Sequence, residues 1–454
     1  MKEMSVIEAA QIMKGKIQGR TDGIITGICV DSREAKEGSL FFALKGETTD
    51  GHRYVPMAYE NGAVAAVTSS AGTVADSCPI CRIVVEDTFK ALQDLARAYR
   101  NRFDIPFVGV TGSSGKTTTK DLIASVLSQK YNTHKTIGNQ NSTTGVPLTI
   151  FNLKDENEIS VMEISMDAPG EILGNAEIVR PNTAVMTNIG MCHIEFLKTR
   201  DAIFKAKSEI LTYLTDKDAA IVNADDDKLA TIASDTYKVI RVGIDNGEKK
   251  AYDIEQTADG VAFRTVFNGQ EAGFRFRLPG LHNVTNCMLA IAVAERYGLT
   301  AEMVQAGFDA FESSNNRMKE IEYDGLTLID DSYNANPDSM RASFDFLSHK
   351  AKGRKVAVVG DMLELGDYSS SLHEQVGEAA SRYGIEVVLY CGSFGNDFLR
   401  GYNKSAAGGE CHIFGDSASL SENIGRYLKE GDTVIFKASH AVGLDKVFKE
   451  FIGR

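Results

Sequence analysis

The segment that most constrains this chain runs from Thr111 to Thr119 and reads Thr-Gly-Ser-Ser-Gly-Lys-Thr-Thr-Thr. It directly follows the apolar run 107–110, which predicts a buried strand, a glycine-rich turn and then a helix. Backbone N–H groups of such a turn, together with the helix N-terminus, can surround phosphate oxygens. The segment therefore predicts a phosphate-binding loop at the carboxyl end of a strand in an α/β sheet.

The side chains of this loop have separate predicted roles. Lys116 would reach the β- and γ-phosphates of a nucleotide, and Thr117 would ligate Mg²⁺. The other predicted nucleotide contacts are Gly112, Ser113, Ser114, Gly115 and Thr118. The usual spacing has a glycine five residues before Gly115, where this chain has Val110. The shorter form T-G-x-x-G-K-T-T favours an ATP-dependent ligase over a GTPase, and a purely structural glycine turn would not require the lysine and the hydroxyls.

Length and strand pattern together predict three α/β domains. A chain of 454 residues exceeds what one hydrophobic core usually serves. Residues 1–102 alternate short strands and helices, which predicts a small α/β domain. Residues 103–313 predict a central domain with a mostly parallel sheet, an antiparallel patch near 251–278 and a helix over 283–296. Residues 314–454 carry four short apolar strands at helical spacings and predict a Rossmann-like domain after a polar linker at 312–316.

Composition and charge exclude several classes of protein. The net charge of -13 disfavours a nucleic-acid partner, because such binders gather Lys and Arg on one face. No apolar run approaches the ~18 residues of a membrane span, and the polar start 1–4 does not resemble a secretory signal. Seven scattered cysteines fit a reduced compartment, so we expect a cytoplasmic protein. We also expect the protein to be a monomer. Cys78 and Cys81 lack a second CxxC pair and a nearby histidine, which favours packed thiols over a redox or zinc site.

Glu163 and His193 are candidate metal ligands. Glu163 lies near the end of the predicted strand 159–164, and His193 follows the predicted strand 183–187. Because the carboxyl ends of parallel strands share one edge of a sheet, both residues should lie on the rim that carries the phosphate loop. Carboxylate oxygen suits Mg²⁺, and imidazole nitrogen is a less usual ligand for it. The simpler alternative is a solvated loop residue, and the shared rim favours the metal site.

Lys207 is predicted to point into the core. The sequence predicts one helix over 200–214 with an apolar stripe formed by Ile203, Ile210, Leu211 and Leu214. Lys207 falls on that stripe, whereas Lys205 points the opposite way. A buried amine loses its hydration and its pKa falls, which suits a nucleophile, a base or a site of carbamylation by CO2. The alternative is a side chain that reaches water from the edge of the stripe.

A polar segment follows the first predicted strand of the last domain. It spans 330–337 and reads Asp-Asp-Ser-Tyr-Asn-Ala-Asn-Pro. Asn336 can cap a helix that has Pro337 at its first position. Because a helix cap needs neither two acids nor a tyrosine, the segment predicts a site for a ribose or a peptide.

On these motifs the chain resembles the Mur ligase family, which builds the peptide of bacterial cell-wall precursors, over essentially its whole length. Segment 111–118 resembles the family's ATP loop, and Gly-Leu-His-Asn-Val-Thr-Asn at 280–286 resembles its adenine-contacting segment. The resemblance implies further nucleotide contacts from Asn283, Asn286, Arg317 and Asp331. It also implies that Thr117, Glu163, His193 and Lys207 form a site for two Mg²⁺ ions, with Lys207 carbamylated. The catalytic residues it implies are Lys116, Lys207 and His193.

Three other segments, 138–147, 331–337 and 360–366, resemble members of the family that add D-alanyl-D-alanine to UDP-N-acetylmuramoyl-tripeptide. The substrate contacts implied by this resemblance are Ser32, Arg33, Lys45, Asn139, Thr143, Tyr333, Asn334 and Asn336. One departure is Lys-Ala-Ser-His at 437–440, where these members more often have Lys-Gly-Ser-Arg, so an arginine contact is absent there.

The implied reaction uses ATP to convert the terminal carboxylate of the tripeptide into an acyl phosphate, which the dipeptide amine then attacks. Closure of the domains would exclude water from the acyl phosphate. The alternatives are a ligase that adds a diamino acid to the preceding dipeptide, folylpolyglutamate synthetase and a nucleotide-switch regulator. The loop 333–336 disfavours the first two, and a switch regulator would hydrolyse nucleotide without two organic substrates. The sequence does not distinguish lysine from diaminopimelate as the third residue of the tripeptide.

Overall fold

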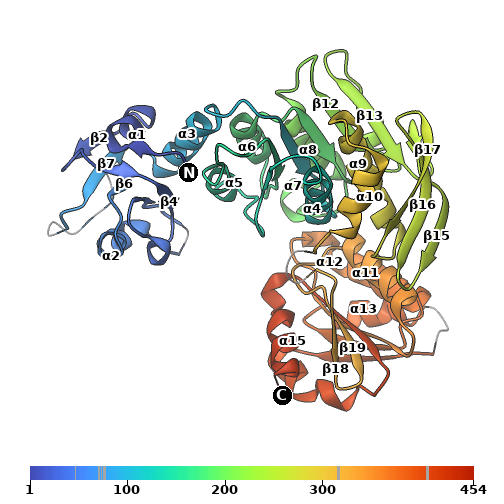
Figure 1. The fold of residues 1–454 in the computed structure, drawn as a ribbon. Helices are drawn as coiled ribbons and strands as arrows, with labels where there is room; N and C mark the ends of the chain where they lie inside the picture. The colour runs from blue at the N-terminus through green and yellow to red at the C-terminus, as the bar shows by residue number, and fades with distance from the viewer. Residues whose placement is uncertain are drawn as a thin grey trace.

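The computed structural model describes residues 1–46, 48–69, 72, 74, 78–313, 317–404 and 408–453. Figure 1 shows three α/β units in chain order: a blue N-terminal unit, a central unit coloured from teal to yellow, and an orange to red C-terminal unit. Each unit has its own mostly parallel sheet, so the predicted three-part α/β fold is confirmed. Of the predicted linker 312–316, residues 314–316 lie outside the described residues.

The N-terminal unit is built on a five-stranded sheet. Its strand order is β2 (Lys16–Gln18), β7 (Cys81–Val85), β6 (Ala65–Ser69), β5 (Ser39–Phe42) and β4 (Gly27–Cys29), with β2 antiparallel to β7. A small pair, β1 (Met4–Ser5) and β3 (Ile24–Ile25), lies beside the helix α1 (Val6–Ile12), and the helix α2 (Val55–Glu60) packs against the 3-10 turns Ser32–Glu34 and Gly51–Tyr54. The helix α3 (Thr88–Arg100), capped by Asp87, leads into the central unit. Cys78 and Cys81 are both free thiols.

The central unit has a seven-stranded parallel sheet. The strand order is β14 (Lys249–Lys250), β13 (Lys238–Gly243), β12 (Ala219–Asn223), β11 (Thr183–Met186), β8 (Phe107–Thr111), β10 (Ile159–Glu163) and β9 (Thr133–Lys135). In register, Glu163 pairs with Val110, and Met186 pairs with Thr111. The carboxyl ends of β8, β10 and β11 therefore meet at one edge, as the sequence predicted. The strands β9, β13 and β14 were not predicted, because their short or charged sequences lack a continuous apolar run.

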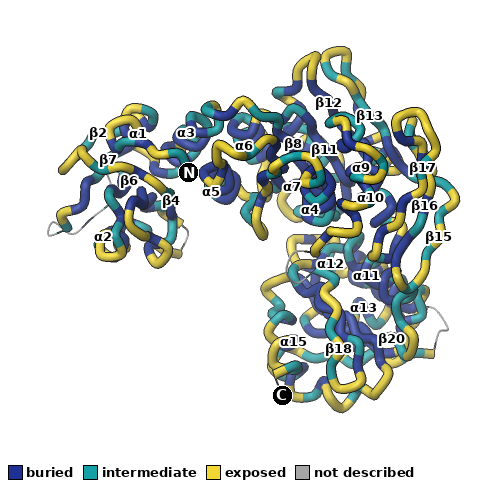
Figure 2. Tube along the Cα trace, viewed as in Figure 1, coloured by how far each residue is buried: buried dark blue, intermediate teal, exposed yellow. Residues whose placement is uncertain are grey.

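Helices cover both faces of this sheet. One face packs against α4 (Lys116–Leu127), α9 (Leu281–Arg296) and α10 (Ala301–Asp309), which also bury the predicted antiparallel patch of β15 (Tyr252–Thr257), β16 (Gly260–Phe267) and β17 (Gln270–Phe276). The other face packs against α5 (Gly145–Ile150), α6 (Glu171–Val179), α7 (Ile194–Leu197) and α8 (Arg200–Lys207). Figure 2 shows the buried strands enclosed by these layers, and the loops at their ends in contact with solvent.

The predicted helix over 200–214 is shorter than expected. The helix α8 ends at Lys207, and a 3-10 turn covers 208–211. The Ser208 hydroxyl donates to the Phe204 carbonyl four residues earlier at 2.7 Å, a side-chain bond that competes with the helical backbone pattern. All four residues of the predicted apolar stripe are nevertheless buried.

The C-terminal unit has a six-stranded sheet where four strands were predicted. The strand order is β18 (Lys319–Tyr323), β19 (Leu326–Asp330), β23 (Thr433–Lys437), β20 (Lys355–Gly360), β21 (Val387–Cys391) and β22 (Glu410–Phe414). The two additional strands, β18 and β22, lie at the edges, and polar residues interrupt their apolar ones, which hides them from a search for apolar runs. One face packs against α11 (Pro337–Lys350), α12 (Ser369–Arg382) and α13 (Gly395–Tyr402), and the other against α14 (Ser417–Asn423) and α15 (Leu444–Ile452).

Candidate active site

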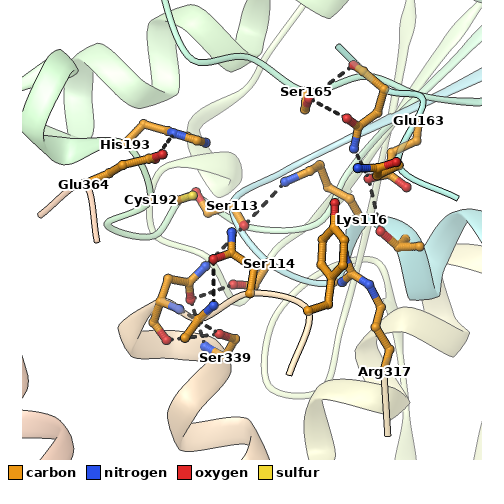
Figure 3. A pocket seen from close by; sticks show the side chains of 18 of the residues that line it. Ser113, Ser114, Lys116, Glu163, Ser165, Cys192, His193, Arg317, Ser339 and Glu364 are labelled. Carbon is orange, nitrogen blue, oxygen red and sulfur yellow. Dashed lines mark hydrogen bonds and ion pairs between the residues drawn. The ribbon is translucent and has the colours of Figure 1, made fainter. Parts of the chain in front are cut away.

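A polar cleft of about 350 Å³ lies where the central and C-terminal units meet, and Figure 3 shows it from close by. One wall is the edge of the central sheet that carries the phosphate loop. The other wall includes the loop of the C-terminal unit that precedes α11. The predicted site residues that line it are Ser113, Ser114, Gly115, Lys116, Thr117, Asn139, Glu163, His193, Arg317, Asp331, Tyr333, Asn334 and Asn336. The structure thus brings most of the predicted nucleotide, metal and acceptor residues into one space.

The phosphate loop adopts the strand, turn and helix arrangement that the sequence predicted. Gly115 is the N-cap of α4 with a φ of 78°, a conformation that favours glycine, and a Cβ atom there would lie 3.1 Å from the Asn286 side chain. The N-terminus of α4 has no side-chain cap, so its first N–H groups are available to an anion. This end of the helix opens into the cleft.

Two of the loop amides are already used within the protein. The Ser113 N–H donates to the Asn188 carbonyl at 3.0 Å, and the Ser114 N–H donates to the Asn188 side-chain oxygen at 2.8 Å. The Lys116 ammonium group donates to the Gly112 carbonyl at 2.8 Å. Asn188, which follows the neighbouring strand β11, therefore fixes the conformation of the loop. The amides at the start of α4 and the Lys116 ammonium group are left to bind phosphate.

Glu163 and Thr117 form a compact buried pair beside this loop. The Thr117 hydroxyl donates to Glu163 Oε1 at 3.1 Å, and the Asn141 amide donates to the same oxygen at 2.7 Å. The other carboxylate oxygen, Glu163 Oε2, is buried without a hydrogen-bond partner among the described residues. A buried carboxylate oxygen without a partner suits a hard cation. The described residues hold no group of three or more His, Cys, Asp or Glu side chains of the kind that binds a metal by itself.

His193 lies at the same rim and faces the C-terminal unit. Its Nδ1 atom is 2.6 Å from Glu364 Oε2 and 3.6 Å from Asp167 Oδ1. Burial by itself lowers the pKa of His193, but interactions with Cys192 and Glu364 outweigh burial and raise that pKa to about 9. His193 therefore lies against a carboxylate of the opposite wall, as Figure 3 shows.

Lys207 is fully buried, as its position on the apolar stripe predicted. Its Nζ atom has no hydrogen-bond partner among the described residues. Burial, followed by repulsion from Lys116, lowers the pKa of Lys207 to about 7. The alternative of a side chain that reaches water is wrong for this residue. Lys207 does not line the cleft itself, although its charge acts on Lys116 and Cys192 there.

The C-terminal wall begins with a buried ion pair at Asp331. The Lys437 ammonium group donates to Asp331 Oδ2 at 2.5 Å, and the Ser343 hydroxyl donates to the same oxygen at 2.7 Å. The Arg317 guanidinium lies 4.5 Å from the centre of the Tyr333 ring, on which it stacks. These contacts hold the start of the polar segment 330–337 in place.

Asn336 joins the two walls. Its side-chain oxygen accepts from the Ser339 N–H at 2.9 Å, which caps α11 as predicted, with Pro337 at the start of the helix. The same oxygen accepts from the Ser114 hydroxyl at 3.0 Å, and its amide nitrogen lies 3.5 Å from the Ser113 carbonyl. Asn336 therefore links the C-terminal wall directly to the phosphate loop.

Some predicted site residues lie elsewhere. Asn283 and Asn286 are buried in α9 behind the phosphate loop, where the Thr119 hydroxyl donates to Asn286 Oδ1 at 3.1 Å. The remaining residues do not line the cleft: Gly112, Thr118 and Thr143 belong to the central unit, and Ser32, Arg33 and Lys45 belong to the N-terminal unit. Arg33 is an exposed side chain paired with Asp31.

Among the cleft residues that were assigned no role from the sequence are Asn141, Glu364 and Lys437. Each lies in a segment that was already singled out by resemblance, namely 138–147, 360–366 and 437–440. Their place in these segments was the signal that could have marked them as site residues. Their partners Glu163, His193 and Asp331 are distant in sequence, so the pairs themselves could not be predicted. Only the packing of strand ends and units brings each pair together.

The comparisons with known proteins agree with this geometry. Family models match three consecutive parts of the chain: Mur ligase family, catalytic domain, at residues 24–100, Mur ligase middle domain at 110–294, and Mur ligase, glutamate ligase domain, at 316–440. The chain belongs to the Mur ligase family.

Individual relatives are similar over nearly the full length. The UDP-N-acetylmuramoyl-tripeptide--D-alanyl-D-alanine ligase of Synechocystis is 36% identical, with 94% of this chain and 92% of the relative covered. The crystal structure of MurF from Acinetobacter baumannii is 30% identical, covers 100% of both chains and superposes with a TM-score of 0.91. MurF from Thermotoga maritima, solved with ADP, is 28% identical, with 94% of this chain and 97% of that chain covered and a TM-score of 0.80.

Proposed function

We propose that this protein is the ATP-dependent ligase that adds D-alanyl-D-alanine to UDP-N-acetylmuramoyl-tripeptide in the synthesis of peptidoglycan precursors. The observation that carries the proposal is the cleft itself, in which the phosphate loop faces the segment 331–337 across a polar space. Nearly full-length relatives with this activity in their names support the choice of substrates. The diamino-acid ligase, folylpolyglutamate synthetase and the nucleotide-switch regulator have no comparable support.

The central wall supplies the groups that handle ATP. The amides at the start of α4 and the Lys116 ammonium group would hold the β- and γ-phosphates and stabilise charge on the phosphoryl group as it transfers. Asn283, Asn286, Arg317 and Asp331 complete the proposed nucleotide site. The tripeptide carboxylate attacks the γ-phosphorus, the bond to the β-phosphate oxygen breaks, and ADP leaves.

The buried pair Thr117 and Glu163 fits one Mg²⁺ ion, since Glu163 Oε2 has no other partner among the described residues. His193 and a modified Lys207 would hold a second. When bound, Mg²⁺ neutralises charge on phosphate and carboxylate oxygens. To hold this ion, His193 would give up its contact with Glu364 and bind as the neutral imidazole.

Lys207 has a buried amine without a hydrogen-bond partner among the described residues, which is unfavourable. Carbamylation would remove this cost if the modified side chain binds a metal ion. The neutral amine adds to CO2 and loses one proton, which leaves a carbamate anion on Nζ. A pKa of about 7 keeps a large share of the amine neutral at physiological pH. The carbamate would also supply negative charge opposite Lys116, whose repulsion now contributes to the low pKa.

We assign the roles of the three domains by the same reasoning. Residues 1–102 would bind the UDP-sugar through Ser32, Arg33 and Lys45, residues 103–313 would bind ATP, and residues 314–454 would bind the incoming dipeptide. Asn139 and Thr143 would contact the tripeptide, and Tyr333, Asn334 and Asn336 the dipeptide. No helix in the described part of the chain is long and apolar enough to span a bilayer. Action as a cytoplasmic monomer stays a prediction from the sequence.

The test is a ligation assay with the purified full chain, ATP and Mg²⁺, followed by mass spectrometry of the product. A panel of UDP-muramoyl acceptors ending in lysine or diaminopimelate is combined with D-alanyl-D-alanine or a free diamino acid. We expect product and ADP only with a tripeptide and the dipeptide. Joining of a diamino acid to the muramoyl-dipeptide, without use of D-alanyl-D-alanine, would contradict the assignment. Nucleotide hydrolysis unaffected by either substrate would favour a switch regulator.

A further inference from the structure

Glu364 is a cleft carboxylate for which the proposed ATP and metal chemistry has no use. It comes from the C-terminal unit, on the loop between β20 and α12, and lines the cleft with a side chain that is 46% exposed. Among the described residues, that wall contributes one other carboxylate to the cleft lining, Asp331. Asp331 is neutralised inside its own unit by Lys437, whereas the ion-pair partner of Glu364 is His193 of the opposite wall.

The loop that carries Glu364 is firmly anchored to the C-terminal sheet. At its start, the Asp361 carboxylate accepts from the Tyr390 hydroxyl at 2.8 Å and from the Ser393 N–H at 2.8 Å. The Met362 N–H donates to His373 Nε2, and the Leu363 N–H donates to the Ser439 hydroxyl, both at 2.9 Å. These hydrogen bonds fix the backbone of the loop that carries the Glu364 side chain.

Glu364 itself has an unusual backbone conformation, with a φ of 61°. Its carbonyl accepts from the Glu195 N–H of α7 at 3.1 Å, so the turn also touches the central wall next to His193. A non-glycine residue in this region costs free energy and persists where the surroundings require it. The turn aims the carboxylate at the end of the cleft where His193 lies, while Arg317 lies at the other end in Figure 3.

We propose that Glu364 binds the ammonium group of the incoming dipeptide and orients its nitrogen toward the acyl phosphate. This inference rests on the proposed function. A zwitterionic dipeptide needs an anionic partner at its amino end. Glu364 supplies such a carboxylate, because its charge is not neutralised inside its own unit as that of Asp331 is. In the substrate-free protein the His193 ring lies against the Glu364 carboxylate, with Nδ1 2.6 Å from Oε2. The dipeptide ammonium group would take the place of the imidazole ring on this carboxylate.

The test separates the amine step from the phosphoryl step. Hydroxylamine is small and largely uncharged at neutral pH, so it can trap an acyl phosphate as a hydroxamate without an ammonium-binding carboxylate. With UDP-N-acetylmuramoyl-tripeptide, ATP and Mg²⁺, we expect Glu364→Gln to form hydroxamate at the wild-type rate. In ligation, the same variant should raise the KM for D-alanyl-D-alanine about tenfold or more, the effect of one lost charged hydrogen bond. Its KM for ATP should stay within about twofold of wild type.

Asp367→Asn is the matched control, since it removes the same charge from an exposed position three residues later, outside the cleft lining. It should leave every parameter near wild type. If Glu364→Gln does not fold, Glu364→Asp, which keeps the charge on a shorter side chain, serves in its place with a smaller rise in the dipeptide KM.

Two outcomes would overturn the assignment of Glu364. An unchanged dipeptide KM would remove it from amine binding, and a parallel fall of hydroxamate and ligation would show that it acts by holding His193. The proposed function fails in a different way, because then wild-type protein would form neither hydroxamate nor ligated product.

Discussion

The two walls of the cleft are built differently. The central wall is held together within its own unit: Asn188 secures the phosphate loop, and Asn141 and Thr117 hold Glu163. The C-terminal wall has a rigid loop and helix of its own, but its described polar links to the central wall are few. They include the contacts of Ser114 with Asn336 and of His193 with Glu364.

This difference indicates that the two walls have different functions. A wall that is preorganised by its own unit can stabilise developing charge without rearrangement, which is where electrostatic catalysis is most effective. A wall attached through few polar bonds can separate to admit substrates and close again. Substitutions in the central wall should therefore affect chemistry, and those in the C-terminal wall should affect substrate binding and closure.

The largest expected effect is from Lys116→Ala. This substitution removes the only charge that the loop offers to the γ-phosphate, and we expect ligation to fall by about 10³-fold or more, a loss of several kcal/mol in transition-state stabilisation. Steady-state ADP release measures the effect, and thermal unfolding checks that the fold survives. Near-normal turnover would remove the phosphate loop from the mechanism and with it the proposed contrast between the walls.

Lys207→Met should abolish most activity and stabilise the protein. Burial lowers the pKa of Lys207 to about 7, so below pH 7 the folded protein contains a buried cation that the unfolded chain would hydrate. Removal of that cation should raise the free energy of unfolding by about 1–4 kcal/mol at pH 6. The gain should shrink as the pH rises from about 7 toward the ordinary value of 10.5, because the lysine is then neutral in the folded protein.

Urea unfolding at pH 6 and pH 9, with the exposed Lys205→Met as the control, measures this prediction. A stability gain that is independent of pH would mean that packing, and not charge, causes it. Crystals of the liganded wild-type protein should show additional density on Lys207 Nζ. A bare, solvent-facing lysine in a closed liganded complex would contradict carbamylation.

Asn336→Ala and Asp331→Ala should separate the roles of the two ends of the polar segment 330–337. We expect Asn336→Ala to raise the KM for the dipeptide about tenfold with little change for ATP, and Asp331→Ala to act mainly on ATP. Loss of the helix cap should also cost Asn336→Ala about 1 kcal/mol of stability. Asn336→Ser is the control for this loss, because serine keeps a capping oxygen but not the amide. Equal effects of both alanine variants on both substrates would argue for one structural role.

Ser114→Ala should have the smallest effect. It removes the hydroxyl that donates to Asn336 Oδ1 and leaves the loop backbone and its bond to Asn188 in place. One neutral hydrogen bond between the walls is worth about 1 kcal/mol, so we expect less than about a tenfold change, seen in the dipeptide KM and not in the trapping of acyl phosphate. A loss as large as that of Lys116→Ala would show that the walls act as one unit.

Much of the central wall could be predicted from the sequence because its signals are local. The run 107–119 specifies strand, turn and helix through adjacent residues, and Gly115 occurs where the backbone requires a positive φ. The inward direction of Lys207 follows from spacings of three and four residues, and the cap at Asn336 follows from its neighbour Pro337. The edge strands β18 and β22 escaped prediction because half-exposed strands carry no continuous apolar pattern.

By itself, the sequence determined the three α/β units, the phosphate loop and the buried lysine, since each depends on periodicity or on residues in immediate succession. The tertiary structure alone decided that Asn188 uses two loop amides, that Asn336 contacts the phosphate loop and that Glu364 faces His193. Asn336 and Ser114 are 222 residues apart, and no local pattern specifies which side chains meet across such a distance. Their contact depends on how two separately folded sheets pack, and this packing creates the cleft.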